Sequence, residues 1–153
     1  IDKNFSIAFA KAQISSGTNL PISGTAFISV KDKDKVSIAK SCRKLVNIGF
    51  ILSATKGTAQ LFLENGISCN QIFKVGEGRP NIVDSIKNEE ISMIINTPLG
   101  AQSRYDEYEI GKAAIKHNIP VITTIAGALA ILRAIRIVMN NKLSYTSLQK
   151  IFK

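Results

Sequence analysis

The chain has 153 residues, of which 45% are hydrophobic, and this composition favours one folded domain over a disordered chain. It has no apolar run long enough to span a bilayer, and its first residues lack the basic and apolar regions of a signal sequence. The formal charge of +9 suits nucleic acid or a small anion. Because the basic residues are scattered along the chain, we expect no nucleic-acid partner and no membrane partner.

The cysteines argue for a reducing environment. Cys42 and Cys69 are not spaced as zinc ligands, and His117 is the single histidine, so we expect no metal site and a cytoplasmic location. Because the chain starts at Ile1 rather than at a methionine, we expect it to be a segment of a longer protein.

Five short β-type runs alternate with helical patterns along the chain. Residues 1–14 form an apolar helix candidate, and residues 15–23 are typical of a linker. The strands are expected at 25–30, 50–53, 71–75, 91–96 and 121–124, and their nearly continuous apolar character is typical of strands covered on both faces. We therefore predict an α/β fold, a three-layer α/β/α sandwich with a mainly parallel five-stranded sheet, Rossmann-like or flavodoxin-like.

Helix signals fill the gaps between these runs. Asp32 and Asp34 are expected to cap a helix that ends at Gly49. Further helices are predicted at 58–65, from Pro80 at a first-turn position, at 104–117, along the apolar stripe from 125 to 139, and as a short helix near the carboxyl terminus.

Polar residues follow each predicted strand, and ligands of open parallel sheets bind at that edge. They are Lys35, the run Thr55-Lys56-Gly57-Thr58, Lys74, Asn96-Thr97 and Thr123-Thr124. No strand end offers a lone carboxylate, which indicates an anion site. The Thr55–Thr58 turn opens a helix, where free N–H groups attract phosphate. Lys35 and Lys74 can neutralise it, and Asn96 can recognise a base or a ribose.

Structural roles compete with these assignments. Thr55 and Thr58 can simply cap a helix, lone lysines are commonly solvated, and Asn96-Thr97-Pro98 can be a turn. Arg79 is either a phosphate clamp or the partner of Glu77 or Asp84 in an ion pair.

Several motifs resemble the methylglyoxal-synthase-like family, and most closely the version that ends the large subunit of carbamoyl phosphate synthetase. They are Phe9-Ala10-Lys11-Ala12-Gln13, Gly49-Phe50, Ala54-Thr55-Lys56-Gly57-Thr58-Ala59, Lys74-Val75, Glu77-Gly78-Arg79-Pro80, Asp84 with Ile86-Lys87-Asn88, Ile94-Ile95-Asn96-Thr97 and Thr123-Thr124. The resemblance implies a junction and linker after an ATP-grasp domain at 1–23, a regulatory domain at 24–141 and a helix or tail at 142–153.

The resemblance also implies a function. The parent enzyme is an ATP-dependent ligase that makes carbamoyl phosphate from bicarbonate, glutamine-derived ammonia and ATP, for pyrimidine and arginine synthesis. Its ATP and Mg or Mn sites lie in upstream ATP-grasp domains, and a small glutaminase subunit is its partner. The terminal domain carries no cofactor and no catalytic residue. It binds a nucleotide effector such as UMP or IMP through Lys35, Thr55, Thr58, Lys74 and Asn96, with Lys56, Gly57 and Thr97 beside them.

Some positions depart from the family pattern. Pro98 replaces a second threonine found in some bacterial members, and Ala101 and Gln102 replace arginines, for which Arg104 can compensate. Val121 replaces a tyrosine near the ornithine site of the family, whereas Thr123 matches. Arg79, Arg104 and Thr123 are therefore secondary site candidates.

The alternative enzyme is methylglyoxal synthase itself, a lyase of dihydroxyacetone phosphate. Its catalytic aspartate lies in a Gly-Gly-Asp-Gln motif, where this chain has Gly76-Glu77-Gly78-Arg79. A signalling receiver domain would need an acidic cluster at the end of the third strand, where Lys74 stands instead.

Overall fold

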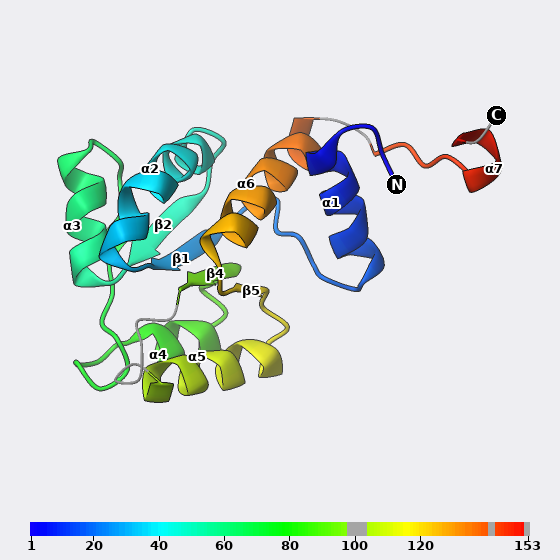
Figure 1. The fold of residues 1–153 in the computed structure, drawn as a ribbon. Helices are drawn as coiled ribbons and strands as arrows, with labels where there is room; N and C mark the ends of the chain where they lie inside the picture. Colours follow the sequence, from blue (N-terminus) through cyan, green and yellow to red (C-terminus); the bar gives the residue numbers. More distant parts are fainter. Residues whose placement is uncertain (98–103, 141–142, 152–153) are drawn as a thin grey trace.

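A five-stranded sheet forms the centre of the computed structural model, which describes residues 1–97, 104–140 and 143–151 (Figure 1). All four strand pairs are parallel, and the spatial order is β3-β2-β1-β4-β5. The strands are β1 (Thr25–Ser29), β2 (Ile51–Ala54), β3 (Asn70–Gln71), β4 (Met93–Asn96) and β5 (Val121–Ile122). The predicted parallel sheet is confirmed, although β3 is shorter than expected and ends before residue 72.

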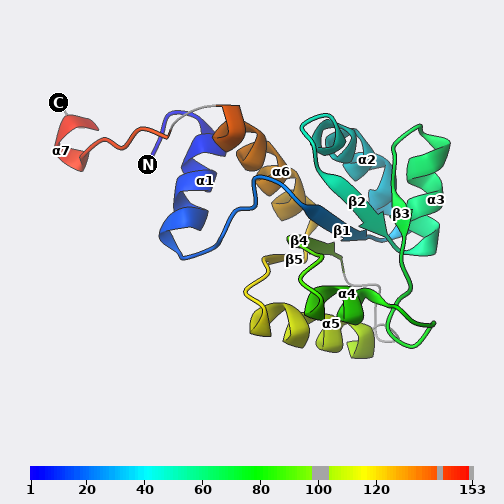
Figure 2. The same ribbon diagram turned by 180° about the vertical axis from the view of Figure 1, so that it is seen from behind.

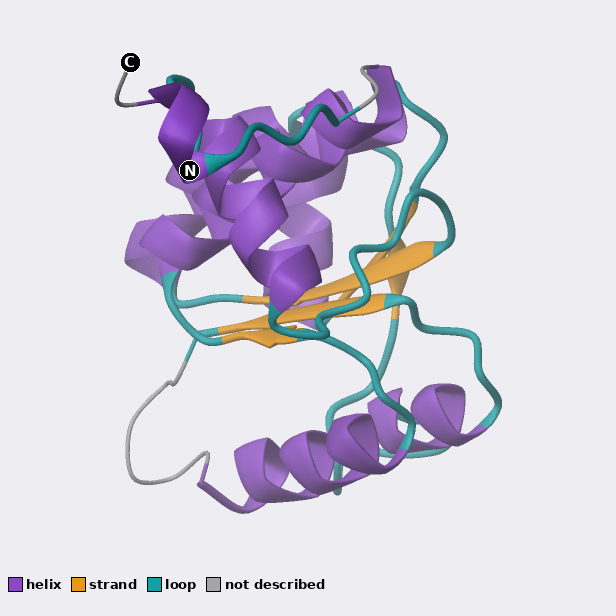
Figure 3. Ribbon diagram, turned by 90° about the vertical axis from the view of Figure 1, so that its right-hand side faces the viewer, coloured by secondary structure: helices purple, strands orange, loops and turns teal. Residues whose placement is uncertain are grey.

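The helices make two layers around this sheet. Helices α1 (Phe5–Ser15), α2 (Asp32–Val46), α3 (Lys56–Glu64) and α6 (Ile125–Asn140) cover one face. Helices α4 (Ile82–Lys87) and α5 (Arg104–Lys116) cover the other face, as Figure 3 shows from the side. The short α7 (Leu148–Ile151) lies apart from both layers, beyond α1 (Figure 2). The predicted three-layer α/β/α sandwich is therefore confirmed.

Alternation along the strands builds two hydrophobic cores. Phe27 and Ile94 point toward α4 and α5 and pack with Ile82, whereas Ile28 and Ile95 pack on the opposite face among residues of α2, α3 and α6. All five side chains are fully buried. Burying a side chain of this size contributes about 1.5–3 kcal/mol, so the two cores fix the sheet between its helical layers.

The strand register brings the functional edge together. In β1, Ile28 is opposite Ala54 of β2, and Ser29 is opposite Asn96 of β4. Because the strands are parallel, their carboxyl ends meet at one edge, and the loops that begin α2 and α3 start side by side there.

Three predicted helix starts are wrong in detail. Helix α3 begins at Lys56, two residues before the predicted start at 58. Asp32 and Asp34 lie inside the first turn of α2, after the N-cap residue Lys31, so they do not cap this helix. Helix α4 begins at Ile82 rather than at Pro80, because Asn81 is its N-cap: the Asn81 side chain accepts hydrogen bonds from two backbone amides of the first turn. A side-chain cap of this kind defines the start of a helix more strongly than a proline does.

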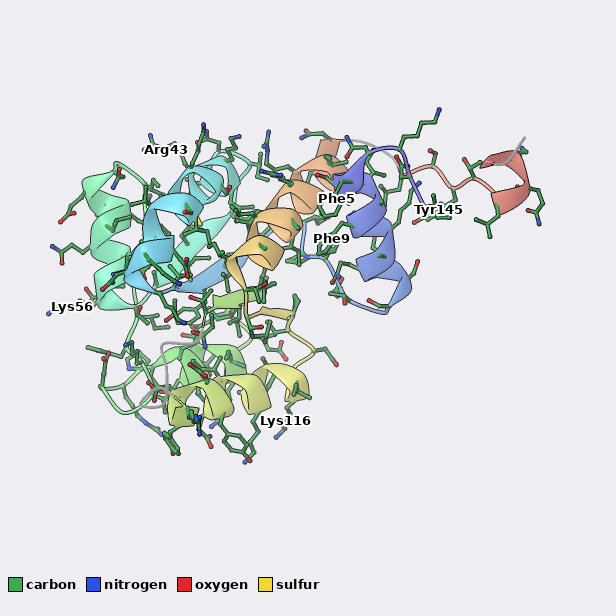
Figure 4. All side chains as sticks on the ribbon, viewed as in Figure 1. Phe5, Phe9, Arg43, Lys56, Lys116 and Tyr145 are labelled. Atoms are coloured by element: carbon green, nitrogen blue, oxygen red, sulfur yellow. The ribbon has the colours of Figure 1, made fainter. Side chains whose placement is uncertain are left out.

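The first helix packs on the last long one, so that α1 lies beside α6 (Figure 1). Lys11 of α1 is buried, forms a 2.8 Å ion pair with Asp2, and lies over the Tyr145 ring. Figure 4 shows Phe5 and Phe9 on the same helix.

Residues 16–24 contain neither helix nor strand, while the proposed boundary at 141–142 lies outside the described residues. None of the described helices is both long and apolar enough to cross a membrane.

Candidate functional site

A pocket of about 420 Å³ opens at the carboxyl ends of β1 and β2, between the starts of α2 and α3 and the loop after β3. We call it the strand-edge pocket. It is lined by Ser29, Val30, Asp32, Lys35, Thr55, Lys56, Gly57, Thr58, Gln60, Lys74 and Glu77. The pocket thus brings together six residues that were named from the sequence: Lys35, Thr55, Lys56, Gly57, Thr58 and Lys74.

Lys35 lines this pocket and is held by an ion pair. It lies one turn inside α2, and its Nζ forms a 2.6 Å ion pair with Asp32. Only 14% of its side chain is exposed, whereas Asp32 is almost fully exposed. The hydrogen bond from Lys35, followed by its charge, lowers the pKa of Asp32. Lys35 is therefore a largely buried cation whose one carboxylate partner is open to solvent.

Gly57 makes room for this cation. A Cβ at position 57 would lie 3.0 Å from Lys35 Nζ. The backbone of Gly57 is ordinary helix, so the absence of a side chain at this position serves the close approach of α3 to Lys35 rather than an unusual turn.

Thr55 and Thr58 are buried residues whose hydroxyls the fold does not use. Thr55 is the N-cap residue of α3, yet its side chain makes no capping hydrogen bond. Within the described part of the chain, neither hydroxyl has a partner, and no fully buried side-chain N or O atom lacks one. Each hydroxyl therefore keeps some exposed surface, and both residues line the pocket. Helix capping does not explain the side chain of Thr55.

The first turn of α3 also presents free backbone amides. The amides of Thr58 and Ala59 both donate to the Thr55 carbonyl at 2.9 Å, so they are engaged within the helix and are not among the free N–H groups of this turn. The amides of Lys56 and Gly57 have no partner among the described residues. They are the donors that the helix leaves for an anion.

Lys74 and Asn96 extend the site toward the centre of the sheet. A smaller space of about 20 Å³ adjoins the pocket and shares Ser29, Thr55 and Lys74 with it. Asn96, the last residue of β4, lines this space; it is 9% exposed, and its carboxamide has no partner among the described residues. Lys74 is not at the end of a strand as predicted, since β3 ends at Gln71.

The loop after β3 that carries Lys74 is fastened at its base. Phe73 forms a parallel bridge with Asn81, and the Ile82 amide donates to the Phe73 carbonyl at 3.1 Å. Glu77 accepts a hydrogen bond from the Lys74 amide at 3.2 Å. Gly78 lies against the ring of Phe73, which a Cβ at position 78 would approach to 3.2 Å. Lys74 therefore projects from a closed loop rather than an open one.

Carboxylates also lie at this edge, close to the lysines of the site. Asp32 and Glu77 line the pocket, and Asp106 and Glu107 line the adjoining space. Burial is the main cause that raises the pKa of Asp106; Lys74 lowers it, and Glu77 and Glu107 add to the increase. Sequence patterns could not identify Asp106, because it lies ten residues beyond the end of β4 and reaches the site through the packing of α5.

The remaining candidates lie away from the pocket lining. Thr97 is buried, and its hydroxyl accepts a 3.1 Å hydrogen bond from the Lys31 amide. Arg79 is 81% exposed and pairs loosely with Asp84, at 3.9 Å, which favours the ion-pair alternative. Arg104 and Thr123 are exposed and line neither space. Pro98, Ala101 and Gln102 lie outside the described residues.

The chemistry of the site suits an anion that carries hydroxyl or base groups. Lys35, Lys56 and Lys74 supply three positive charges against two carboxylates in the pocket lining. Free amides and hydroxyls can donate to phosphate oxygens, and Asn96 offers both a donor and an acceptor. In the described part of the chain, no group of three or more His, Cys, Asp or Glu residues is placed to hold a metal ion.

Comparison with known families identifies the fold. Residues 37–123, from within α2 to the residue after β5, match the model of the MGS-like domain. The chain belongs to the MGS-like domain family. This MGS-like domain also matches curated proteins along nearly its whole length.

Those relatives are carbamoyl phosphate synthases. The domain is 48% identical to the carbamoyl phosphate synthase large chain, C-terminal section, of Methanopyrus kandleri, over 100% of this chain and 28% of that protein. It is 42% identical to the carbamoyl phosphate synthase large chain, C-terminal section, of Aquifex aeolicus, over 99% of this chain and 29% of that protein. It is 42% identical to the carbamoyl phosphate synthase large chain of a Nostoc species, over 98% of this chain and 14% of that protein. The chain thus spans less than a third of each of these relatives, and the resemblance expected from its motifs is confirmed.

Proposed function

We propose that this MGS-like domain is the regulatory section of a carbamoyl phosphate synthase large chain and binds a nucleoside monophosphate in the strand-edge pocket. The observation that carries the proposal is that Lys35, Thr58 and Lys74 line one pocket, in which the fold leaves the hydroxyls of Thr55 and Thr58 and the amides of Lys56 and Gly57 unpaired. The names of the relatives support the assignment to the large chain.

The phosphate is placed at the start of α3. There it accepts hydrogen bonds from the amides of Lys56 and Gly57 and from the hydroxyls of Thr55 and Thr58. Lys35 and Lys74 balance its charge from two sides. In this arrangement Lys35 exchanges the exposed carboxylate of Asp32 for the phosphate, which costs little because the Asp32 carboxylate is already solvated.

The nucleoside is placed toward β4. Asn96 can donate to and accept from a base or a ribose, and the carboxylates of Glu77 and Asp106 can accept from ribose hydroxyls. The same carboxylates repel a second phosphate, which favours a monophosphate such as UMP or IMP over a di- or triphosphate.

Regulation follows as a difference in affinity. If the effector binds one packing of this domain against the rest of the subunit more tightly than another, it shifts that equilibrium, and substrates shift effector affinity by the same factor. The parent ligase would make carbamoyl phosphate from bicarbonate, glutamine-derived ammonia and ATP in the cytoplasm. ATP and Mg or Mn would be bound by upstream ATP-grasp domains, and a small glutaminase subunit would be its partner.

Calorimetric titration of the chain with UMP, IMP, UDP and ornithine tests the binding step. We expect one site for UMP or IMP and weaker binding of UDP. Lys74→Gln should weaken the monophosphate roughly tenfold or more, and Lys87→Gln, a basic residue at the end of α4 outside the pocket, should not. In an intact synthase that carries this section, the Lys74 variant should lose nucleotide control and keep its uninhibited turnover. Binding that Lys74→Gln leaves unchanged would remove the proposal.

Methylglyoxal synthase remains the second candidate, because Asp106 places a carboxylate of raised pKa beside the pocket. The residue that corresponds to the catalytic aspartate of the family motif is Gly78, which has no side chain. Phosphate release from dihydroxyacetone phosphate by the chain, lost in Asp106→Asn, would favour the lyase; no release leaves the regulatory function.

A further inference from the structure

A second basic cavity lies on the helical layer, between α2 and α6, and we call it the α2/α6 groove. Its volume is about 410 Å³, close to that of the strand-edge pocket. It is lined by Ser37, Lys40, Ser41, Lys44, Leu129, Leu132, Arg133 and Arg136. These residues lie at helical spacing on each of two facing helices, so that both helices present one continuous face to the groove.

The groove is positively charged without compensation. Four of its eight lining residues are cations and none is acidic. Across the described residues, no carboxylate forms an ion pair with Lys40, Lys44, Arg133 or Arg136, and the residues outside that part of the chain include no aspartate or glutamate. In the strand-edge pocket, by contrast, each of two carboxylates lies near a lysine.

This arrangement works against folding. Lys40 and Lys44 are four residues apart on α2, and Arg133 and Arg136 are three apart on α6, so each helix places two like charges next to each other. Such pairs destabilise a helix, and facing the two pairs across one groove adds to the repulsion. Arg43 on α2 does not share the arrangement: it points elsewhere, and its guanidinium donates to the Asn65 carbonyl (labelled in Figure 4).

The groove is distinct from the strand-edge pocket. The two cavities share no lining residue. Lys40 and Lys44 lie in the second half of α2, whereas the strand-edge pocket is at its first turn. At 1.5 Å per residue, Lys44 is about 18 Å along the helix axis from Asp32.

We infer that the α2/α6 groove is a second anion site, which binds a small ligand carrying two or more phosphate charges. Two guanidinium groups on one helix face suit paired contacts with phosphate oxygens, and two ammonium groups opposite balance the remaining charge. Ser37 and Ser41 add hydroxyl donors. Leu132 is fully buried and Leu129 half-buried, so the floor of the groove is apolar and takes the organic part of the ligand.

Pyrophosphate and orthophosphate are the probes that test this inference. The chain, labelled with ¹⁵N, is titrated with each at matched ionic strength, with UMP present to occupy the strand-edge pocket. We expect saturable shifts of the amides of residues 37–44 and 129–136, with pyrophosphate bound at least roughly tenfold more tightly than orthophosphate because it engages both helices. Equal weak responses to both anions would indicate general screening and overturn the inference.

Paired variants locate the site. Arg133→Gln with Arg136→Gln should weaken pyrophosphate roughly tenfold or more, and Lys112→Gln with Lys116→Gln, the same charge loss on α5 (Lys116 is labelled in Figure 4), should leave it unchanged. If the arginine variant melts early, Lys40→Gln with Lys44→Gln replaces it. Equal loss in the α5 variant, or binding of polyglutamate but not pyrophosphate, would reject a small-ligand site in this groove.

Discussion

Gly57 on α3 lies directly against the ammonium group of Lys35 on α2: a Cβ at position 57 would be 3.0 Å from Lys35 Nζ. The same glycine supplies one of the two unpaired amides at the start of α3. Gly57 therefore has two roles in binding the proposed phosphate. It leaves room for the Lys35 cation, and its own amide is a hydrogen-bond donor.

Gly57→Ala separates binding from stability. Alanine favours helix over glycine by up to about 1 kcal/mol, and the displaced Lys35 Nζ is the free end of a flexible side chain, so the free energy of unfolding should be unchanged or slightly higher. Nucleotide affinity should fall about tenfold, because Lys35 moves away from the phosphate. Calorimetry and urea unfolding measure the two effects.

The matched control is Gly111→Ala on α5, where an added Cβ would meet nothing within 4 Å. It should stabilise the helix in the same way and leave binding unaltered. A Gly57→Ala protein that binds UMP normally would show that Lys35 does not contact the phosphate.

Asp32→Asn should strengthen nucleotide binding a few-fold. The neutral side chain no longer competes for Lys35, and it removes one negative charge from the pocket mouth. Asp34→Asn makes the same charge change in the same turn of α2 but outside the pocket lining. Affinities measured by calorimetry should therefore differ between the two variants. Equal effects would mean that the charge of the helix start matters and the ion pair does not.

Thr58→Val and Thr97→Val should have opposite consequences. Valine at 58 keeps the shape and removes a hydroxyl that the fold does not use, so binding should weaken about tenfold at nearly normal stability. Valine at 97 leaves the Lys31 amide without its partner, which should cost about 1–3 kcal/mol of unfolding free energy and leave affinity intact. Thermal melts and titrations of both variants provide the comparison; loss of stability in Thr58→Val would indicate a structural hydroxyl.

Alkaline pH should destabilise the protein through its thiols. Burial, together with the nearby Cys69, raises the pKa of Cys42 to about 12, and burial raises that of Cys69 to about 11, from an ordinary value of 9.0. Both folded pKa values are raised, so the stabilising contribution is complete below pH 9 and is lost as the pH rises toward these values. For Cys42 the slope is at most about 1.4 kcal/mol per pH unit.

Urea unfolding at pH 8 and pH 10 measures this slope. Cys42→Ala should be less stable than the parent chain at both pH values, because it leaves a small cavity. Its free energy of unfolding should fall less than that of the parent chain between pH 8 and pH 10. A variant with the same pH dependence as the parent chain would contradict the assignment. At neutral pH neither thiol should react readily with iodoacetamide, since the thiolate is scarce.

Much of the site could be predicted because the topology of the sheet determines which residues meet. The carboxyl ends of parallel strands meet at one edge, so residues after β1, β2 and β4 had to gather there, and Lys35, Thr58 and Asn96 do. The start of α4 was misplaced at Pro80 because proline and Asn81 are adjacent and only the side-chain cap decides between them.

The acidic part of the site could not be predicted in the same way. Lys31, Asp32, Lys33, Asp34 and Lys35 alternate in sign, so several local pairings were possible. The structure selects the pair of Asp32 with Lys35, beside Gly57. Asp106 reaches the site through the packing of α5 on α4, a tertiary contact for which the sequence offers no periodic signal.

The closed loop between β3 and α4 bears on the entropy of recognition. Its two ends are joined by the Phe73–Asn81 bridge, and Asn81 and Asp84 hold each other at the start of α4. The backbone of Lys74 therefore loses its conformational entropy when the chain folds, before a ligand binds. A ligand that meets Lys74 finds a preorganised cation and needs to immobilise only its side chain, so association at this edge can proceed without a loop-ordering step.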